Sequence, residues 1–269
     1  MVRILIFLCV LPSWGWSATS AELDRLHAAL DSRALMDILS EEGIAQSEDL
    51  RSDMFPGRGG AGWTVSVRQI YDPERLFSTF RKAFDAEMAE AAIDELLAFY
   101  YTDTGAHIAE LEVDARRAIM SEEVEDAAKR AYENLLETGT ERLALLEEFA
   151  DVNGLIDRNV AGALNSNLQF FKGLASVGSF EMTENDMLSE VWSQEQSIRE
   201  DTEQWVFGYM TFAYETVSSA ELRTYIDMTA TRQGRALNRA LFAGFDAVFQ
   251  GVSYRLGEAT AQFSMGDEL

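Results

Sequence analysis

Apolar residues recur at helical spacing through almost the whole chain. In the stretch 92–105, AIDELLAFYYTDTG, the spacing i, i+3, i+4, i+7 places Ile93, Leu96, Leu97 and Tyr100 on one stripe of an α-helix. No stretch shows the strict alternation of apolar and polar residues that is typical of strands. Only three prolines occur in 269 residues. The pattern predicts an all-α protein built as a multi-helix bundle.

Local signals locate helix starts and breaks along this pattern. Asp72 precedes Pro73 and predicts a helix start. The Asp72 side chain can accept hydrogen bonds from exposed backbone amides, and proline lacks the amide N–H that would have no partner at the first helical position. Thr183, three residues before Asp186, predicts another start. Gly43 is expected to end a short helix, and Gly139 to break a long helical segment.

The stretch 92–105 has an echo at 221–234, ELRTYIDMTATRQG, shifted by 129 positions. Each stretch is an apolar helical ridge that runs into Thr-x-x-Gly, and each precedes another helical segment. We therefore predict an internal repeat of two related helical units, the first at 22–150 and the second at 151–269. The same shift pairs a helix-start aspartate, a tryptophan and a helix-breaking glycine: Asp72 with Asp201, Trp63 with Trp192, and Gly105 with Gly234.

The Thr-x-x-Gly stretches are interpreted first as structural motifs. Threonine can bond local backbone amides and help to start the next helix. Glycine can take the left-handed conformation that closes a helix, or allow a close backbone approach. The motif residues are Phe99, Tyr100, Thr102 and Gly105 in the first copy, and Thr231 and Gly234 in the second.

Aromatic residues of the first copy have two interpretations. Phe99 and Tyr100 are most simply anchors in the core. The alternative is a binding role for the hydroxyls of Tyr100 and Tyr101. Tyr101 and His107 are the candidate binding residues.

The first 21 residues, MVRILIFLCVLPSWGWSATSA, have the three parts of a secretory signal peptide: a basic start, an apolar run and an exit of small residues. Cleavage is expected after Ala21, with Ala18 as the alternative. The apolar run is shorter than the roughly 20 residues that span a bilayer, so we expect no integral membrane segment after cleavage and a periplasmic or secreted product. Cys9, the only cysteine, would leave with the signal.

Acidic residues dominate the charge, with 46 Asp and Glu against 22 Lys and Arg and a formal net charge of −24. Such a field repels phosphate backbones and anionic lipid surfaces, which excludes nucleic acid as an expected partner. Hydrophobic residues make up 47% of the chain, enough apolar surface for a core despite this charge.

The sequence offers little for catalysis or for a metal. His27 and His107 are the only histidines, and no Glu-x-x-His of a di-iron bundle or His-Glu-x-x-His of a zinc protease occurs. The glycine-rich stretch 55–63, FPGRGGAGW, lacks the Gly-Lys-Ser/Thr end of a phosphate-binding loop. We predict no catalytic, cofactor-binding or metal-binding residues, and we expect the protein not to be an enzyme.

The end of the first stretch, FYYTDTG at 99–105, resembles the F-Y-x-S/T-x-x-G signature of a bacterial exported helical family known as domain of unknown function 2059. The resemblance is strongest over 72–120. It returns in weaker form over 201–249, where Met228 and Thr229 replace the Phe-Tyr pair. It implies an all-helical envelope protein. The family has no established reaction, so it supplies no catalytic residues.

Together these features predict an exported, non-enzymatic binding or interaction module of the cell envelope, with another envelope protein as its partner. One alternative is a binder of an apolar small molecule or lipid in an interhelical cavity. Another is an uncharacterised enzyme or metal-binding helical bundle. A deep cavity lined by Phe and Tyr would favour the apolar ligand, and a broad apolar patch would favour protein contact.

Overall fold

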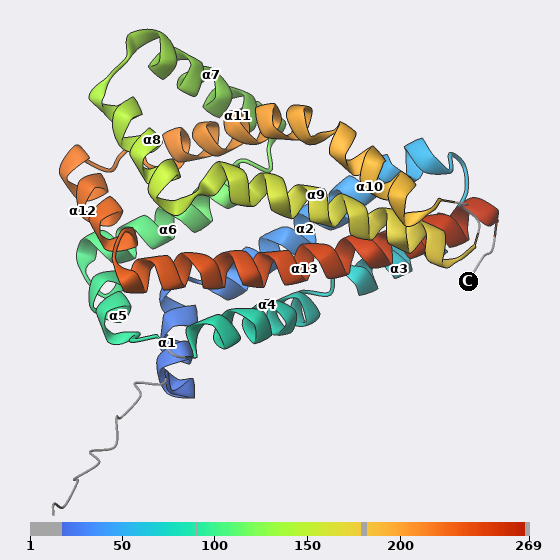
Figure 1. Ribbon diagram of the computed structural model, residues 1–269, viewed down its shortest axis with the longest axis horizontal. Helices are drawn as coiled ribbons and strands as arrows, with labels where there is room; N and C mark the ends of the chain where they lie inside the picture. The colour runs from blue at the N-terminus through green and yellow to red at the C-terminus, as the bar shows by residue number, and fades with distance from the viewer. Residues whose placement is uncertain (1–17, 90, 179–181, 267–269) are drawn as a thin grey trace, which may run out of the picture.

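The computed structural model describes residues 18–89, 91–178 and 182–266, and these form thirteen α-helices and no strand (Figure 1). The predicted all-α bundle is therefore confirmed. Most of the predicted signal peptide, including Cys9, lies outside the described residues. The helices are α1 (Ser20–Ala29), α2 (Ser32–Met54), α3 (Gly60–Ile70), α4 (Pro73–Met88), α5 (Asp94–Tyr100), α6 (Asp103–Ala118), α7 (Glu122–Thr138), α8 (Glu141–Asn153), α9 (Leu155–Ser176), α10 (Glu184–Ser193), α11 (Glu195–Ala213), α12 (Ser219–Thr229) and α13 (Arg232–Met265).

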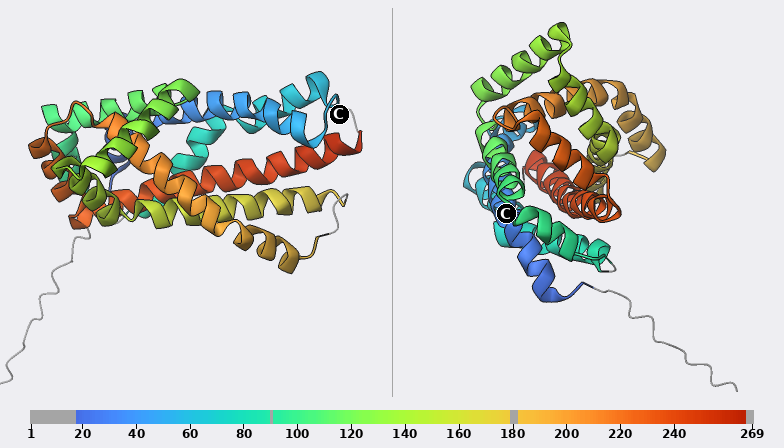
Figure 2. Two further views of the ribbon diagram at one scale, coloured as in Figure 1. Left: turned by 90° about the horizontal axis from the view of Figure 1, so that it is seen from above. Right: turned by 90° about the vertical axis from the view of Figure 1, so that its left-hand side faces the viewer.

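The longest helix, α13, runs along the middle of the molecule and packs against α9, α4 and α3. Figure 2 shows α9 and α13 side by side over most of their length. On the other side of α9 lies α11, which also packs against α7. The short helices α5 and α12 lie at the left-hand end in Figure 1. None of the helices described has the length and apolar character needed to cross a membrane.

Glycine allows α9 and α13 to come into backbone contact. A Cβ on Gly173 would lie 2.1 Å from the carbonyl oxygen of Tyr254, and one on Gly257 would lie 2.2 Å from that of Phe170. These distances are too short for any side chain, so the two helices need glycine at both positions.

Two hydrophobic clusters form the core, and each draws on both predicted units. The first joins α1 to α5, and Ala109 of α6, with α13 around Trp63, Phe80 and Phe263. The second joins α6 and α8 with α11 and α12. The predicted boundary after residue 150 falls inside α8. The division into two units remains a prediction.

Several predicted helix boundaries are found. Asp72 accepts from the backbone amide of Arg75 at 2.8 Å at the start of α4. Thr183 caps α10 in a reciprocal capping box with Asp186. Gly139 ends α7 in the left-handed conformation, with φ 58°. Each of these signals acts within one helical turn, which is why the sequence reveals it.

The prediction for Gly43 is wrong, because this residue lies inside the continuous helix α2. The ring of Tyr71 packs against it, and a Cβ at Gly43 would lie 1.9 Å from that ring. The glycine therefore makes room for a side chain from a distant part of the chain and does not end a helix.

One of the two predicted cleavage sites, Ala21, lies inside α1, and the other, Ala18, precedes this helix. Thr19 caps α1: its hydroxyl accepts from the amide of Glu22 at 3.3 Å, and the Glu22 carboxylate accepts from the Thr19 amide at 2.8 Å. Cleavage after Ala21 would remove this cap, whereas cleavage after Ala18 would keep it. Loss of such a cap costs about 0.5 to 2 kcal/mol, which gives a physical reason for the alternative site.

Two of the three pairings that suggested the repeat do not share an environment. Asp201 lies inside α11 and is not a helix cap like Asp72. Trp63 is 0% exposed and donates to the carbonyl oxygen of Ser47 at 3.2 Å, whereas Trp192 is 65% exposed on α10. At these two positions the shift of 129 therefore pairs residues that differ in role or in exposure.

Candidate functional site

The two Thr-x-x-Gly joints have the same local geometry. At the α5–α6 joint, the Thr102 hydroxyl accepts from the Gly105 amide at 3.0 Å and donates to the Phe99 carbonyl oxygen at 2.7 Å. At the α12–α13 joint, the Thr231 hydroxyl accepts from the Gly234 amide at 2.9 Å and donates to a carbonyl oxygen at 2.7 Å. Each threonine is the N-cap of the helix that follows.

Both motif glycines serve close backbone approach. A Cβ on Gly105 would lie 2.2 Å from the Phe99 carbonyl oxygen, and one on Gly234 would lie 2.2 Å from that of Met228. Neither glycine has a positive φ, so the left-handed alternative does not apply. In both joints the glycine sits in the first turn of the new helix, directly against the end of the old one.

The aromatic residues of the first joint differ in exposure. Tyr100 is buried, and Phe99 stacks on Tyr225 of α12 with ring centroids 5.7 Å apart. Tyr101 is 57% exposed, with the guanidinium of Arg25 5.1 Å from its ring centroid. His107 is exposed on α6. Tyr101 and His107 line neither of the two pockets described below.

Behind the first joint, α6 carries a carboxylate that the sequence analysis missed. One oxygen of Glu112 accepts from the hydroxyl of Tyr214 at 2.6 Å and from that of Tyr225 at 2.9 Å. The hydroxyl of Tyr209 donates to the Glu112 carbonyl oxygen at 2.8 Å. We call these four residues the tyrosine–glutamate cluster. It ties α6 to α11 and α12.

Burial decides the protonation behaviour of this cluster. Burial raises the pKa of the Glu112 carboxyl, and the hydrogen bonds from Tyr214 and Tyr225 oppose part of that shift. Burial close to Glu112 raises the pKa of both tyrosines as well. One sequence signal was available: Glu112 follows Ile108 by four residues and precedes Ala115 by three, so it lies on the apolar stripe of α6.

The other histidine lies in a separate polar group. His27 is buried, with Nε2 2.8 Å from an oxygen of Asp85 and Nδ1 3.2 Å from the hydroxyl oxygen of Ser32. Arg81 bonds the other oxygen of Asp85 at 3.2 Å. The three residue types match a catalytic triad, but Ser32 is 0% exposed and no substrate could reach its hydroxyl. This group joins α1, α2 and α4.

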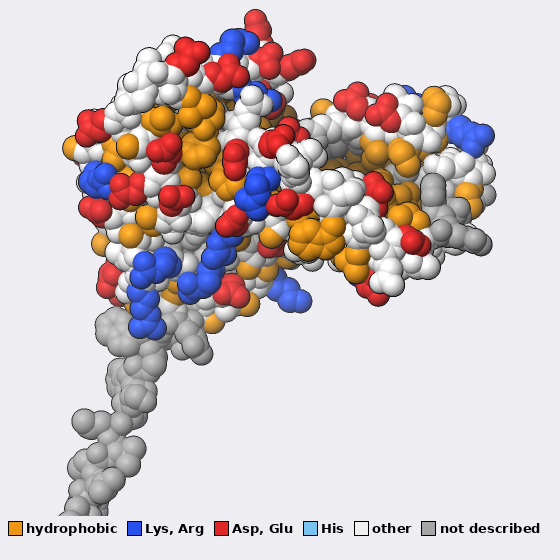
Figure 3. Space-filling view, turned by 45° about the horizontal axis from the view of Figure 1, so that its top comes forward, with side chains coloured by type: hydrophobic (Ala, Val, Ile, Leu, Met, Phe, Trp, Pro, Cys, Tyr) orange, Lys and Arg blue, Asp and Glu red, His pale blue; other side chains and the backbone are white. Residues whose placement is uncertain are grey.

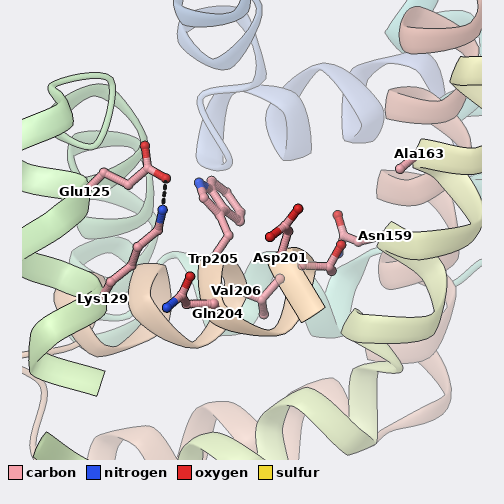
Figure 4. A pocket seen from close by; sticks show the side chains of 9 residues that line it. Glu125, Lys129, Asn159, Ala163, Asp201, Gln204, Trp205 and Val206 are labelled. Carbon is pink, nitrogen blue, oxygen red and sulfur yellow. Dashed lines mark ion pairs between the residues drawn. The ribbon is translucent and has the colours of Figure 1, made fainter. Parts of the chain in front are cut away.

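An open pocket of about 450 Å³, which we call the Trp205 pocket, lies over α11 between α7 and α9 (Figure 4). Trp205 and Asp201 come from α11, and Asn159 comes from α9. On the α7 wall Lys129 and Glu125 form an ion pair at 2.8 Å. The lining thus combines charged and polar side chains with the apolar surfaces of Trp205, Ala163 and Val206.

A second pocket of about 320 Å³ lies where α5 meets the α12–α13 joint. It is lined by Glu95, Leu96, Asp227, Met228, Thr231 and Gln233. Phenylalanine and tyrosine are absent from the lining of both pockets, and so are His27 and His107. Neither pocket is the cavity lined by Phe and Tyr that would favour the apolar-ligand alternative.

The most exposed large hydrophobic side chain of the described residues belongs to α10. Trp192 follows Leu188 by four residues, and both side chains are exposed; we call this pair the α10 face. Met187 and Val191 of the same helix are buried. Figure 3 shows hydrophobic side chains among acidic ones at the right-hand end of the molecule, where α10 lies.

Among the described residues, no three His, Cys, Asp or Glu side chains come together as a metal site would require. A family model described as an uncharacterized protein conserved in bacteria (DUF2059) matches residues 74–133. The match confirms the family resemblance at the first joint and includes Glu112, but it does not reach the second joint. No curated protein and no solved structure matches the chain.

Proposed function

We propose that this protein is an exported, non-enzymatic binding module of the bacterial cell envelope, and that its α10 face binds a basic amphipathic segment of a partner protein. The signal-like pattern of residues 1–21 supports export to the periplasm. The exposure of Trp192 on a helix rich in acidic residues is the observation that carries the binding proposal.

Packing fixes which side of α10 faces outward. Met187 and Val191 are buried and hold the helix against α9. Leu188 and Trp192 are one turn apart, so they present a single apolar strip to solvent. Tryptophan is enriched among the residues that contribute most to protein–protein binding, because it covers a large apolar area with few rotatable bonds.

Charge around this strip favours a basic partner. Within α10, Glu184, Asp186 and Glu190 are acidic, and the helix has no Lys or Arg. Lys172 lies 3.6 Å from Glu184, and it is the one basic residue that pairs with an acid of α10 in the described structure. A helix with apolar and basic faces would satisfy both the strip and the acidic rim.

Surface charge, pocket lining and burial weigh against the two alternatives, the binder of an apolar molecule and the enzyme. The acidic surface repels anionic lipid, and neither of the two pockets is lined by phenylalanine or tyrosine. For catalysis, His27 and Ser32 are buried and line neither pocket. A protein partner is therefore the function that the geometry supports best.

Binding of a synthetic amphipathic helix of Lys and Leu to the purified protein tests the proposal. Trp192→Ala is expected to weaken binding at least about tenfold, a loss typical of a central aromatic contact. The matched control is Val65→Ala, which truncates another exposed hydrophobic residue, 55% exposed on α3. The control should bind as the wild type does.

A helix of Glu and Leu with the same apolar pattern provides the charge control and should bind far more weakly. Equal binding of the Lys and Glu peptides, or unchanged binding by Trp192→Ala, would contradict the proposal. A photo-crosslinking residue at position 192, compared with one at position 65 in cells, then identifies the natural partner.

A further inference from the structure

The structure points to a second binding function, separate from the α10 face. We propose that the Trp205 pocket binds the ammonium end of a small organic amine, with Asp201 as the counter-charge and the Trp205 ring as the apolar surface. The proposal is carried by the cavity, by its unpaired carboxylate and by a fixed aromatic ring.

Asp201 and Trp205 lie one turn apart on α11, and both side chains point into the pocket (Figure 4). Asp201 takes part in none of the ion pairs formed among the described residues. An ammonium group beside Asp201 would contact the carboxylate and the π face of the indole together. Such a pairing combines charge attraction with a cation–π contact.

The indole ring is held in place before any ligand arrives. Trp205 stacks on Tyr209, with ring centroids 5.4 Å apart and an interplanar angle of 6°. Tyr209 in turn donates to the Glu112 carbonyl oxygen on α6. The guanidinium of Arg116 already lies 5.7 Å from the Trp205 centroid, so the ring tolerates a cation nearby. A rigid ring lowers the entropy cost of binding.

The other charged residues in and near the pocket determine its net charge. Lys129 and Glu125 neutralise each other at 2.8 Å, and Arg116 is paired with Glu42. Asp201 is left as the net charge of the pocket lining. A free anion such as phosphate would meet this carboxylate without an unpaired cation to hold it.

A neutral acceptor also lines the pocket. The side-chain amide nitrogen of Asn159 donates to the Leu155 carbonyl oxygen at 2.8 Å. This bond leaves the amide oxygen of Asn159 as an acceptor on the α9 wall. Carboxylate, amide oxygen and indole suit an ammonium group, which donates up to three hydrogen bonds. The cavity of about 450 Å³ is of the size that takes small molecules.

Isothermal titration with 1,4-diaminobutane at about 0.15 M salt tests the proposal, because this ionic strength screens diffuse attraction to an acidic protein. We expect one amine bound per chain. Asp201→Asn should weaken binding at least about tenfold, since it removes the only unpaired charge of the lining. Trp205→Leu should also weaken it, and circular dichroism checks that each variant is folded.

The matched control is Glu200→Gln, which removes the same charge from the adjacent position on α11; this position is exposed, as Asp201 is, but does not line the pocket. Equal loss in Asp201→Asn and Glu200→Gln would show diffuse charge attraction and overturn the proposal. Absence of amine binding, or binding of inorganic phosphate in its place, would overturn it too. Trp192→Ala should bind the amine as the wild type does. Amine binding can therefore be shown even if the α10 face binds no peptide.

Discussion

The two joints share a backbone solution but differ in the side chains around it. In both, a threonine caps the new helix and a glycine lies against the end of the old one. The first joint adds Phe99 and the buried Tyr100, where the second has Met228 and Thr229. The shared part is what the turn itself requires, and the differing part belongs to the packing around it.

Helices α4 and α11, which precede α5 and α12, extend this comparison. Helix α4 packs on α13, which follows the second joint, and α11 packs on α6, which follows the first. Phe80 of α4 meets Phe245 of α13 with ring centroids 5.1 Å apart. With the shift of 129 applied, Tyr209 of α11 occupies the place of Phe80, and it bonds the backbone of Glu112 on α6. Because each of these helices packs on a helix of the other half, both core clusters contain residues of both halves. The internal repeat remains a prediction, which this relation supports.

The difference between the two helix pairs is one of polarity. Leu241 of α13 corresponds by the same shift to Glu112 of α6, so an apolar contact on one side matches a hydrogen-bonded cluster on the other. A similar crossing of helices thus accommodates two kinds of side-chain chemistry. The following predictions test which part of each joint is structural.

The largest effect is expected for Gly105→Ala and Gly234→Ala. Each new Cβ would meet a backbone carbonyl oxygen at 2.2 Å, and a backbone atom cannot swing aside as a side chain can. We expect each variant to lose about 3 kcal/mol or more of unfolding free energy, measured by chemical denaturation.

Gly251→Ala is the matched control for these variants, because no atom lies within 4 Å of its Cβ position in α13. It should gain up to about 1 kcal/mol from helix propensity. If only one of the two motif variants is destabilised, the equivalence of the joints fails.

An intermediate effect on stability is expected at Glu112, the position at which the α6–α11 pair differs from the α13–α4 pair. Glu112→Leu copies the residue of the other side and leaves the hydroxyls of Tyr214 and Tyr225 without their acceptor. It should destabilise the protein by about 1 to 3 kcal/mol, even though leucine is tolerated at position 241. Glu112→Gln keeps an acceptor oxygen and should cost less. Equal stability of wild type and Glu112→Leu would contradict the structural role of the cluster.

The pH dependence of stability separates the charge of Glu112 from its hydrogen bonds. Because the folded state raises the pKa of this carboxyl, the folded chain holds the proton more tightly than the unfolded chain does. Its contribution to stability is therefore full below the unfolded pKa and is lost as pH rises toward the folded value. Relative to Glu112→Gln, the wild type should lose stability as the pH rises above about 4.3, the ordinary pKa of a glutamate side chain. If the unfolding free energies of the wild type and Glu112→Gln changed in parallel with pH, this prediction would be contradicted.

The smallest effect is expected for Tyr101→Ala, at a residue of the first joint that is 57% exposed. The unfolding free energy should change by less than about 0.5 kcal/mol, as is usual at exposed positions. Differential scanning calorimetry measures it. A large loss would place Tyr101 among the structural residues of the joint and remove it as a candidate binding residue.

The sequence by itself determined the features that depend on neighbours within one helical turn. The all-α class follows from the spacing of apolar residues, and the caps at Asp72, Thr183 and Thr102 follow from side chains that bond amides three residues ahead. The family resemblance at the first joint has the same local basis. These signals are short and repeatable, so a pattern can reveal them.

Only the tertiary structure decided the features that join distant segments. Tyr225 bonds Glu112 across 113 positions, and the Trp205 pocket needs walls from three helices. Gly43 is explained by the ring of Tyr71, and the exposure of Trp192 by the way α10 rests on α9. Helical periodicity says which residues share a face. It does not say which helix covers that face, because this depends on packing between segments far apart in the chain.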